Sequence, residues 1–366
     1  MSQKRLIIFI PSIEGGGVEK NLFIISDFLS KKINDISLIT ISKRFKKKFN
    51  KKIKFISPKL NFWDSLGRRK KFIVSLFLLL IEIFKDRNLT VFCFQGNIYC
   101  TLLCKLFGIK IIVRSNSAPE GWSQNIFKFY CFKYIFKFAD EIIVNSLDFK
   151  GKFKKKFNLK TLCIYNPLNK KEIIIKSKTK PKIMFSKKKV NFINVGRFTD
   201  QKDQITLLKA VNLLKNKINF NLLIVGYGKK RNFLVNYINE NNLQKKVKIV
   251  PYQTNPYNLI KSSDIFILTS LYEGLPNVLL EAQVLKKFII SSNCPTGPRE
   301  ILLGGKAGFL FQVGNVNELK NKILFVTNKT NKKNIKDKIK KGYDSIYRFG
   351  FSKNMNLYLN EVKKYL

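Results

Sequence analysis

Residues 190–202 read VNFINVGRFTDQK, in which a run of mainly β-branched and aromatic residues ends at Gly196 and is followed by charged residues. Such a short apolar run is typical of a buried strand. Similar runs recur along the chain, separated by amphipathic stretches of helix length. Because strands and helices alternate, the sequence predicts doubly wound parallel sheets, an α/β fold class. We expect strands at residues 6–10, 36–41, 90–94, 109–114, 141–144 and 161–165, then at 190–195, 221–225, 246–250, 265–269, 288–292 and 308–312.

The alternation is interrupted once, between residues 169 and 189, where the chain is rich in lysine and has little periodicity. A chain of 366 residues has room for two or three domains. The sequence therefore predicts two Rossmann-like domains, at residues 1–175 and 190–350. Helical spacing of apolar residues after Gly350 predicts a final helix within residues 351–366.

The chain is strongly basic, with 70 Lys and Arg against 23 Asp and Glu and a net charge of +47. This imbalance favours anionic partners such as phosphates, nucleic acid or an anionic membrane face. The basic runs are dispersed, however, which favours a biased genome composition and solvated faces over a dedicated polyanion site. They lie at residues 44–52, 68–71, 187–189 and 332–341.

The absence of histidine excludes the Ser-His-Asp and Cys-His forms of catalysis and imidazole ligands for zinc. The six cysteines include no C-x-x-C pair and lie mostly in apolar runs, so we expect free thiols and a cytoplasmic protein.

The longest apolar run, residues 72–84, is shorter than the ~20 residues of a spanning helix. We therefore expect no transmembrane segment.

Three glycines, Gly15, Gly16 and Gly17, follow the first predicted strand and open a helix. Glycine lets the backbone approach a ligand closely, and the free amides of a helix N-terminus favour an anion such as a diphosphate. The segment is not G-x-G-x-x-G, which argues against a nicotinamide or flavin site. A tight strand-to-helix turn without a ligand explains the triplet equally well.

Two cations, Arg197 and Lys202, follow the first strand of the second predicted domain. In an open α/β sheet, ligands bind beyond the carboxyl ends of the strands. The pair could therefore hold a diphosphate without a metal ion. The alternative is two unrelated basic residues in a very basic protein.

Two carboxylates, Glu273 and Glu281, are eight residues apart around a helix that we expect to start at about Pro276. The first amides of this helix suit a phosphate. A wholly helical spacing would place the carboxylates about 12 Å apart. A glycosidase pair is only ~5 to 9.5 Å apart, so these two groups are better suited to different parts of a long ligand. Glu281 could also be a structural helix residue.

These three segments, in this order, resemble the retaining nucleotide-sugar glycosyltransferases of family 4, and the similarity covers almost the whole chain. The E-x7-E pattern at Glu273 and Glu281 is the most specific feature. The resemblance implies the GT-B fold, with two domains facing each other across a cleft and the C-terminal helix packing back on the N-terminal domain. Residues 292–301, SNCPTGPREI, are similar to the subgroup that adds N-acetylhexosamine to bacterial polyprenol-diphosphate-linked and lipopolysaccharide glycans.

The resemblance also implies roles for single residues. Gly16 and Gly17 would approach the donor phosphates, and Glu281 would bind the ribose hydroxyls. The catalytic group would comprise Glu273, which contacts the transferred sugar, and the cations that neutralise the diphosphate, Arg197 and Lys202. The remaining donor-site positions would be Gly274, Leu275, Asn277 and Val278.

Breaking the sugar–phosphate bond moves negative charge onto the nucleoside diphosphate, and fixed cations stabilise that charge. The chain contains no D-x-D sequence, the usual carboxylate motif of metal-dependent GT-A enzymes. We therefore expect metal-independent transfer and no cofactor, with a UDP-sugar as the donor.

The chain departs from the family in one segment, residues 114–122, where many members carry a histidine and this chain reads RSNSAPEGW. A front-face retaining mechanism can dispense with that histidine, because the leaving phosphate itself can take the acceptor proton. Asn116 and Glu120 become the acceptor-side candidates.

The expected acceptor is a lipid-linked glycan, so we expect peripheral attachment to the anionic inner face of the cytoplasmic membrane. Basic residues 68–71 lead into the apolar run, and Lys128, Lys133 and Lys137 alternate with aromatic residues. Apolar helices that cover a sheet explain the same stretches.

Alternative functions are a sugar-nucleotide 2-epimerase and a nucleic-acid-binding protein. No RNP, zinc-finger or helix-turn-helix pattern supports the latter, so we expect no nucleic-acid partner.

Overall fold

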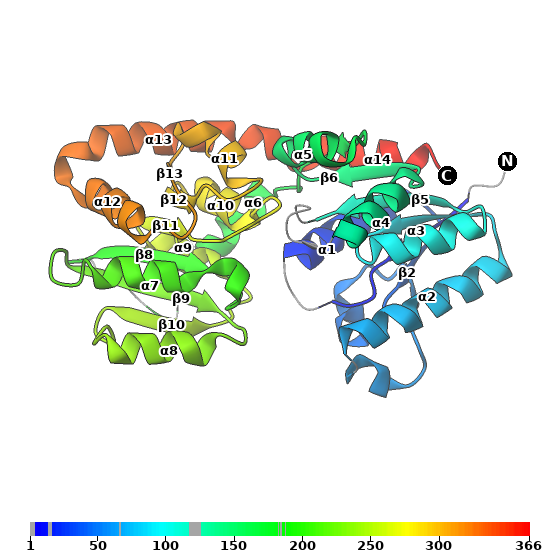
Figure 1. Cartoon of the computed structure of the whole chain (residues 1–366), viewed down its shortest axis with the longest axis horizontal. Coiled ribbons are helices and arrows are strands. Elements are labelled where there is room, and N and C mark those ends of the chain that lie inside the picture. The colour runs from blue at the N-terminus through cyan, green and yellow to red at the C-terminus, as the bar shows by residue number, and fades with distance from the viewer. Residues whose placement is uncertain are drawn as a thin grey trace. The chain divides into compact units, whose positions relative to one another are not determined.

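The computed structural model describes residues 4–13, 17–65, 67–116, 126–181, 183, 185–186 and 188–366. The chain forms two compact units (Figure 1). Unit 1 extends to Pro167 and includes residues 351–366, and unit 2 comprises residues 168–350. Each unit is built on its own parallel sheet, as the alternating sequence pattern predicts.

Unit 1 contains a seven-stranded sheet in the order β3-β2-β1-β4-β5-β6-β7. Side chains of β1 alternate between two apolar cores: Ile7 and Phe9 pack in one and Leu6 and Ile8 in the other, so both faces of the sheet are covered. The strands are β1 (Arg5–Phe9), β2 (Ile36–Ile39), β3 (Lys54–Ile56), β4 (Leu89–Cys93), β5 (Lys110–Ser115), β6 (Glu141–Val144) and β7 (Leu162–Cys163). The helices are α1 (Gly17–Ser30), α2 (Arg68–Lys85), α3 (Asn97–Leu106), α4 (Ile126–Lys137), α5 (Leu147–Phe157) and α14 (Phe351–Lys363).

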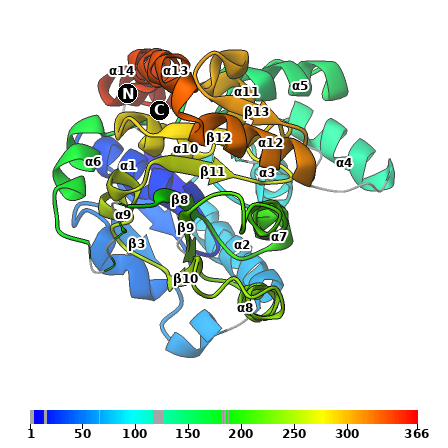
Figure 2. The same cartoon turned by 90° about the vertical axis from the view of Figure 1, so that its left-hand side faces the viewer.

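Unit 2 contains a six-stranded sheet in the order β10-β9-β8-β11-β12-β13. Figure 2 shows α7, α8 and α12 on one side of this sheet and α6 and α9 on the other. The strands are β8 (Val190–Val195), β9 (Phe220–Gly226), β10 (Val247–Pro251), β11 (Ile265–Leu268), β12 (Phe288–Ser292) and β13 (Phe309–Phe311). The helices are α6 (Lys170–Ser177), α7 (Gln204–Asn212), α8 (Arg231–Glu240), α9 (Tyr257–Ser262), α10 (Asn277–Val284), α11 (Pro298–Ile301), α12 (Val316–Thr327) and α13 (Lys332–Asp344).

The final helix, α14, packs on the sheet of unit 1. Tyr358 and neighbouring apolar residues of α14 are buried in the same core as Leu6 and Ile8. The hydroxyl of Thr90 on β4 donates to the carbonyl of Tyr365 at 2.6 Å. The chain therefore passes between the units twice, after Pro167 and after Gly350.

Every strand predicted from the sequence is present, with ends within two residues of the expected ones. The sequence missed β3, a three-residue edge strand in a lysine-rich stretch that has no apolar run. The predicted domain boundary also differs. Helix α6, most of which falls within the predicted first domain, lies in unit 2, where Asn255 donates to the carbonyl of Lys176 at 2.9 Å.

Candidate active site

The loop after β8 presents Arg197 to solvent. Phe198, the next residue, is buried in the core of unit 2, and its amide donates to the carbonyl of Tyr227 at 2.7 Å. The Gln204 side chain donates to the carbonyl of Arg197 at 2.9 Å. The backbone of Arg197 is thus fixed, while its exposed guanidinium has no hydrogen bond or ion pair to any described residue.

Close approach of two loops requires Gly226 at the end of β9. A Cβ atom on Gly226 would lie 1.9 Å from the carbonyl oxygen of Gly196, so any other residue would displace the loop that carries Arg197. This contact joins the carboxyl ends of β8 and β9, where a parallel sheet binds its ligands.

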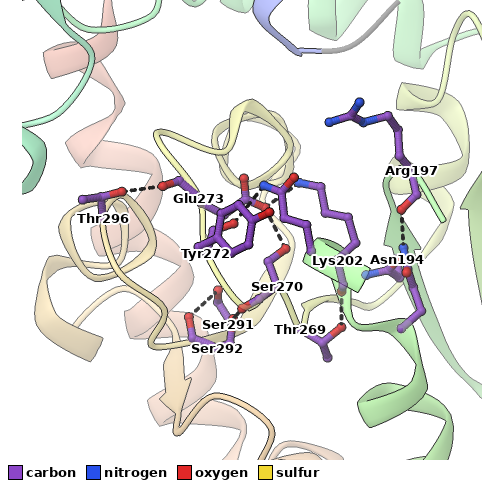
Figure 3. Close-up of polar contacts among 12 residues, drawn as sticks. Asn194, Arg197, Lys202, Thr269, Ser270, Tyr272, Glu273, Ser291, Ser292 and Thr296 are labelled. Carbon is purple, nitrogen blue, oxygen red and sulfur yellow. Dashed lines mark hydrogen bonds and ion pairs between the residues drawn. The ribbon is translucent and has the colours of Figure 1, made fainter. Parts of the chain in front are cut away.

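Lys202 and Glu273 form a buried ion pair in the same unit. Nζ of Lys202 lies 2.5 Å from Oε1 of Glu273, and the exposed fractions of the two side chains are 16% and 8%. The hydroxyl of Ser270 donates to the same carboxylate oxygen at 2.7 Å. In Figure 3 the amine and the carboxylate point toward one another, and no dashed line joins the Arg197 guanidinium to either of them.

Hydrogen bonds from three segments hold the loop that contains Glu273. The amide of Leu271 donates to the carbonyl of Gln201 at 2.8 Å, which fixes this loop beside Lys202. The hydroxyl of Thr296 donates to the carbonyl of Glu273 at 2.5 Å, and that of Ser292 to the carbonyl of Ser270 at 2.6 Å. The carboxylate is therefore positioned by β12 and the loop that follows it, as well as by its own loop.

The loop after β12 passes directly over Gly274. Gly297 in that loop has a φ of +86°, and a Cβ atom there would lie 2.3 Å from the carbonyl oxygen of Gly274 and 2.7 Å from Cδ of Pro276. Cys294, in the same loop, is buried near Glu273. Burial and that carboxylate raise the pKa of the Cys294 thiol to about 12, so the thiol stays neutral.

The helix that the sequence predicts to start at about Pro276 is α10, which begins at Asn277 with Pro276 as its N-cap. Glu273 therefore lies in the preceding loop and Glu281 in the helix, where it is buried. Because residues 273–276 are not helical, the separation expected for a wholly helical spacing does not apply. Gly274 and Leu275 are buried, and Asn277 and Val278 at the start of α10 are half-buried.

The predicted ligand-binding residues of unit 1 are described only in part. Gly17 is the first residue of α1 and is exposed, whereas Gly16 and Glu120 lie outside the described residues. The Asn116 side chain is held inside the unit, since its Nδ2 donates to the carbonyl of Phe94 at 2.8 Å and its Oδ1 accepts from Arg114. The amide of Asn116 thus bridges the carboxyl ends of β4 and β5.

Residues 175–342 match the family model described as glycosyl transferases group 1. The match covers most of unit 2. The matched residues include Arg197, Lys202, Glu273 and Glu281, so all four lie in the part of the chain that is similar to this family.

Two relatives match different shares of the chain. A Methanocaldococcus jannaschii protein, named an uncharacterized glycosyltransferase, is 34% identical over 216 residues, which cover 55% of this chain and 53% of that protein. A Campylobacter jejuni protein, named N-acetylgalactosamine-N,N'-diacetylbacillosaminyl-diphospho-undecaprenol 4-alpha-N-acetylgalactosaminyltransferase, is 27% identical over 336 residues. That alignment covers 86% of this chain and 88% of the relative.

The fold matches that of solved glycosyltransferase structures. The Anabaena protein Alr3699/HepE, solved in complex with UDP and glucose, superposes with a TM-score of 0.78 at 14% sequence identity, over 99% of this chain and all of that one. The prediction of the GT-B fold is confirmed.

The sequence missed the residues that support the site. Ser270 and Thr296 contact Glu273, and Gly297 permits the loop to approach Gly274. Their signal in the sequence is weak, because small polar residues at the ends of strands are common. Contact with a buried carboxylate distinguishes them only once the fold is known.

Proposed function

We propose that this chain is a retaining, metal-independent glycosyltransferase that moves N-acetylhexosamine from a UDP-sugar to a lipid-linked or lipopolysaccharide glycan. The family match and the printed name of the Campylobacter relative support this class of reaction. The absence of D-x-D from the sequence supports transfer without a metal ion.

The observation that carries the proposal is the guanidinium of Arg197, which pairs with no described residue and lies on the same loop as Lys202, whose amine pairs with Glu273 of the loop after β11. In the proposed reaction the sugar–phosphate bond breaks and the leaving diphosphate gains negative charge. Arg197 meets that charge, and Lys202 shares its amine between Glu273 and the diphosphate. The first amides of α10 add further donors for the phosphates.

In this mechanism Glu273 orients the transferred sugar and Glu281 binds the ribose hydroxyls. The acceptor oxygen attacks the anomeric carbon from the face that the diphosphate leaves, so the configuration is retained. The leaving phosphate takes the acceptor proton, which suits a chain that contains no histidine.

The proposed acceptor remains in a membrane, so we also propose peripheral attachment to the cytoplasmic face through unit 1. None of the described helices is both long and apolar enough to cross a bilayer. Helix α3 packs against both α2 and α4 (Figure 1), and all three carry exposed apolar side chains. These are Ile73, Phe77, Phe84, Tyr99, Leu102, Leu106, Tyr130 and Tyr134, with Phe138 just after α4.

The charges near these helices support attachment only in part. Arg69, Lys70 and Lys137 are exposed and available to anionic headgroups. Lys71, which the sequence placed with them, is instead buried and lies 3.3 Å from the carboxylate of Asp64. The side chain of Lys128 lies outside the described residues, and Lys133 is half-buried.

A donor screen tests the proposed reaction. Purified chain is incubated with UDP-N-acetylglucosamine, UDP-N-acetylgalactosamine, UDP-hexoses and GDP-sugars and a polyprenol-diphosphate-linked glycan, and products are read by mass spectrometry and their anomeric configuration by NMR. We expect an α-linked N-acetylhexosamine product whose yield EDTA does not change. A β-linked product would contradict retention, and loss of activity with EDTA that Mg²⁺ or Mn²⁺ restores would contradict metal independence.

A further inference from the structure

Arg114 near the end of β5 is a fully buried cation. Its exposed fraction is 0%, and its guanidinium donates to side-chain oxygens from three separate parts of unit 1. Nε donates to the hydroxyl of Tyr358 on α14 at 2.9 Å, and a terminal nitrogen donates to Oδ1 of Asn166 at 2.6 Å. The other terminal nitrogen donates to Oδ1 of Asn116.

All three acceptors of Arg114 are neutral. No carboxylate among the described residues pairs with it. Arg5 on β1, a largely buried arginine of the same sheet, does have such a partner and lies 2.6 Å from Glu82. A buried guanidinium without a counter-charge is costly, and an apolar side chain would fill the same volume at lower cost. What this position requires is therefore the planar set of N–H donors that a guanidinium provides.

The guanidinium of Arg114 helps to fix the carboxyl edge of the sheet. Asn116, held at Oδ1 by Arg114, donates from Nδ2 to the carbonyl of Phe94 just after β4. Asn97 at the start of α3 donates to the carbonyl of Arg114 at 3.3 Å. The Arg114 side chain thus joins the ends of β4 and β5 through Asn116, and its backbone carbonyl accepts a bond from the start of α3.

We infer that Arg114 is a positioning residue for the acceptor glycan. This inference rests on the proposed function, in which unit 1 receives the acceptor. The carboxyl edge of a parallel sheet is where its ligands bind, and Arg114 lies directly beneath that edge in unit 1. It acts through Asn116 and the strand ends.

The test compares transfer with donor hydrolysis in the same enzyme preparation. Arg114→Lys keeps the charge and removes the fork, and Tyr358→Phe removes a single acceptor while keeping the ring. The ratio of transfer to hydrolysis does not depend on how much of the enzyme is folded, because both rates scale with the folded fraction. We expect the ratio to fall at least tenfold in Arg114→Lys and two- to fivefold in Tyr358→Phe, with the Kd of the donor unchanged.

Arg5→Lys is the matched control, since Arg5 is a largely buried arginine at the amino end of a strand in the same sheet. It should lower thermal stability and leave the ratio unchanged. Equal falls in transfer and hydrolysis for Arg114→Lys, or a fall in the ratio for Arg5→Lys of the same size, would overturn the inference. A wild-type chain that turns over no sugar nucleotide would instead refute the proposed function and the role of Arg114 with it.

Discussion

Lys202 and Glu273 are 71 residues apart in the chain, yet their charged groups lie 2.5 Å from one another inside unit 2. The cation expected to receive the donor diphosphate is therefore already neutralised by the carboxylate expected to contact the sugar. An anion bound beside Lys202 would weaken the interaction between Lys202 and Glu273. The contact expected with the diphosphate and the contact expected with the sugar are therefore coupled through this ion pair. Arg197, whose guanidinium pairs with no residue that the structure describes, needs no such exchange.

A double-mutant cycle should reveal this coupling. Lys202→Met leaves a buried carboxylate without its cation, so we expect the free energy of unfolding to fall by about 3 kcal/mol. Adding Glu273→Gln should restore at least half of that loss, because the remaining buried group is then neutral. Urea unfolding of the four proteins measures the cycle. Additive losses in the double variant would show that the pair is not coupled.

Arg197→Ala and Glu281→Ala should have different kinetic effects. In the proposed mechanism Arg197 meets charge that develops as the bond breaks, so its loss should lower kcat by about 10²-fold. In the same mechanism Glu281 contacts the ribose in the ground and transition states alike, so its loss should mainly raise the donor KM. Arg197 is exposed and pairs with none of the described residues, so Arg197→Ala should leave the melting temperature unchanged. A rise in donor KM with unchanged kcat in both variants would reject the assigned roles.

Gly297→Ala should disturb the loop that holds Glu273. Its φ of +86° and the 2.3 Å approach of a Cβ atom to the carbonyl of Gly274 combine strain with a backbone clash. We expect a loss of at least about 3 kcal/mol in stability, together with a lower kcat/KM for the donor.

Gly314→Ala is the control for that prediction. Gly314 has a φ of +73°, but a Cβ atom there meets nothing within 4 Å. Backbone strain alone should cost about 1 kcal/mol, with kinetics unchanged. Similar losses in the two variants would mean that the clash with Gly274 is relieved by a shift of the loop.

The pKa of Cys294 predicts how stability changes at alkaline pH. The folded chain keeps the thiol proton up to about pH 12, whereas the unfolded chain loses it near pH 9.0. Between these values the folded state binds one proton more, so stability falls as the pH rises. Cys294→Ala should therefore show a shallower decline between pH 9 and 11 in chemical unfolding. An identical slope in both proteins would contradict the burial of an undissociated thiol.

Vesicle sedimentation tests the proposed membrane attachment. Binding should require anionic lipid and weaken as salt rises, and replacing Lys128, Lys133 and Lys137 by Glu should reduce it by about 1 kcal/mol for each cation that faces the surface. The matched control replaces Lys217, Lys245 and Lys329 by Glu, three exposed lysines of unit 2 that change the net charge equally. An equal loss of vesicle binding in the two triple variants, or no binding at all, would mean that the basic charge reflects genome composition and not membrane attachment.

The strands and the donor-site segments could be predicted from the sequence because each depends on local pattern. Apolar runs identified the strands, and Pro276 identified the start of α10 to within one residue. The edge strand β3 could not be found, since Lys54–Ile56 pairs with only one neighbour and lacks an apolar run. The place of α6 also escaped prediction, because its contacts are with residues about 80 positions away.

The sequence could not show which polar groups pair inside the fold. Lys202 and Glu273 were each singled out, but their bond depends on the neighbouring positions of β8 and β11 in the sheet. Arg114 went unnoticed because it appears as one charged residue at the end of an apolar run. Its importance comes from Tyr358, which is 244 positions away.

The return of α14 to unit 1 affects the order in which the chain can fold during synthesis. Unit 2 is one continuous segment, residues 168–350, and all of it can leave the ribosome before unit 1 is complete. Until residues 351–366 emerge, the core around Leu6 and Ile8 lacks Tyr358, and Arg114 lacks one of its acceptors. The domain that is translated first is therefore the last to be finished, and its uncovered apolar face is the one that a chaperone would meet on the nascent chain.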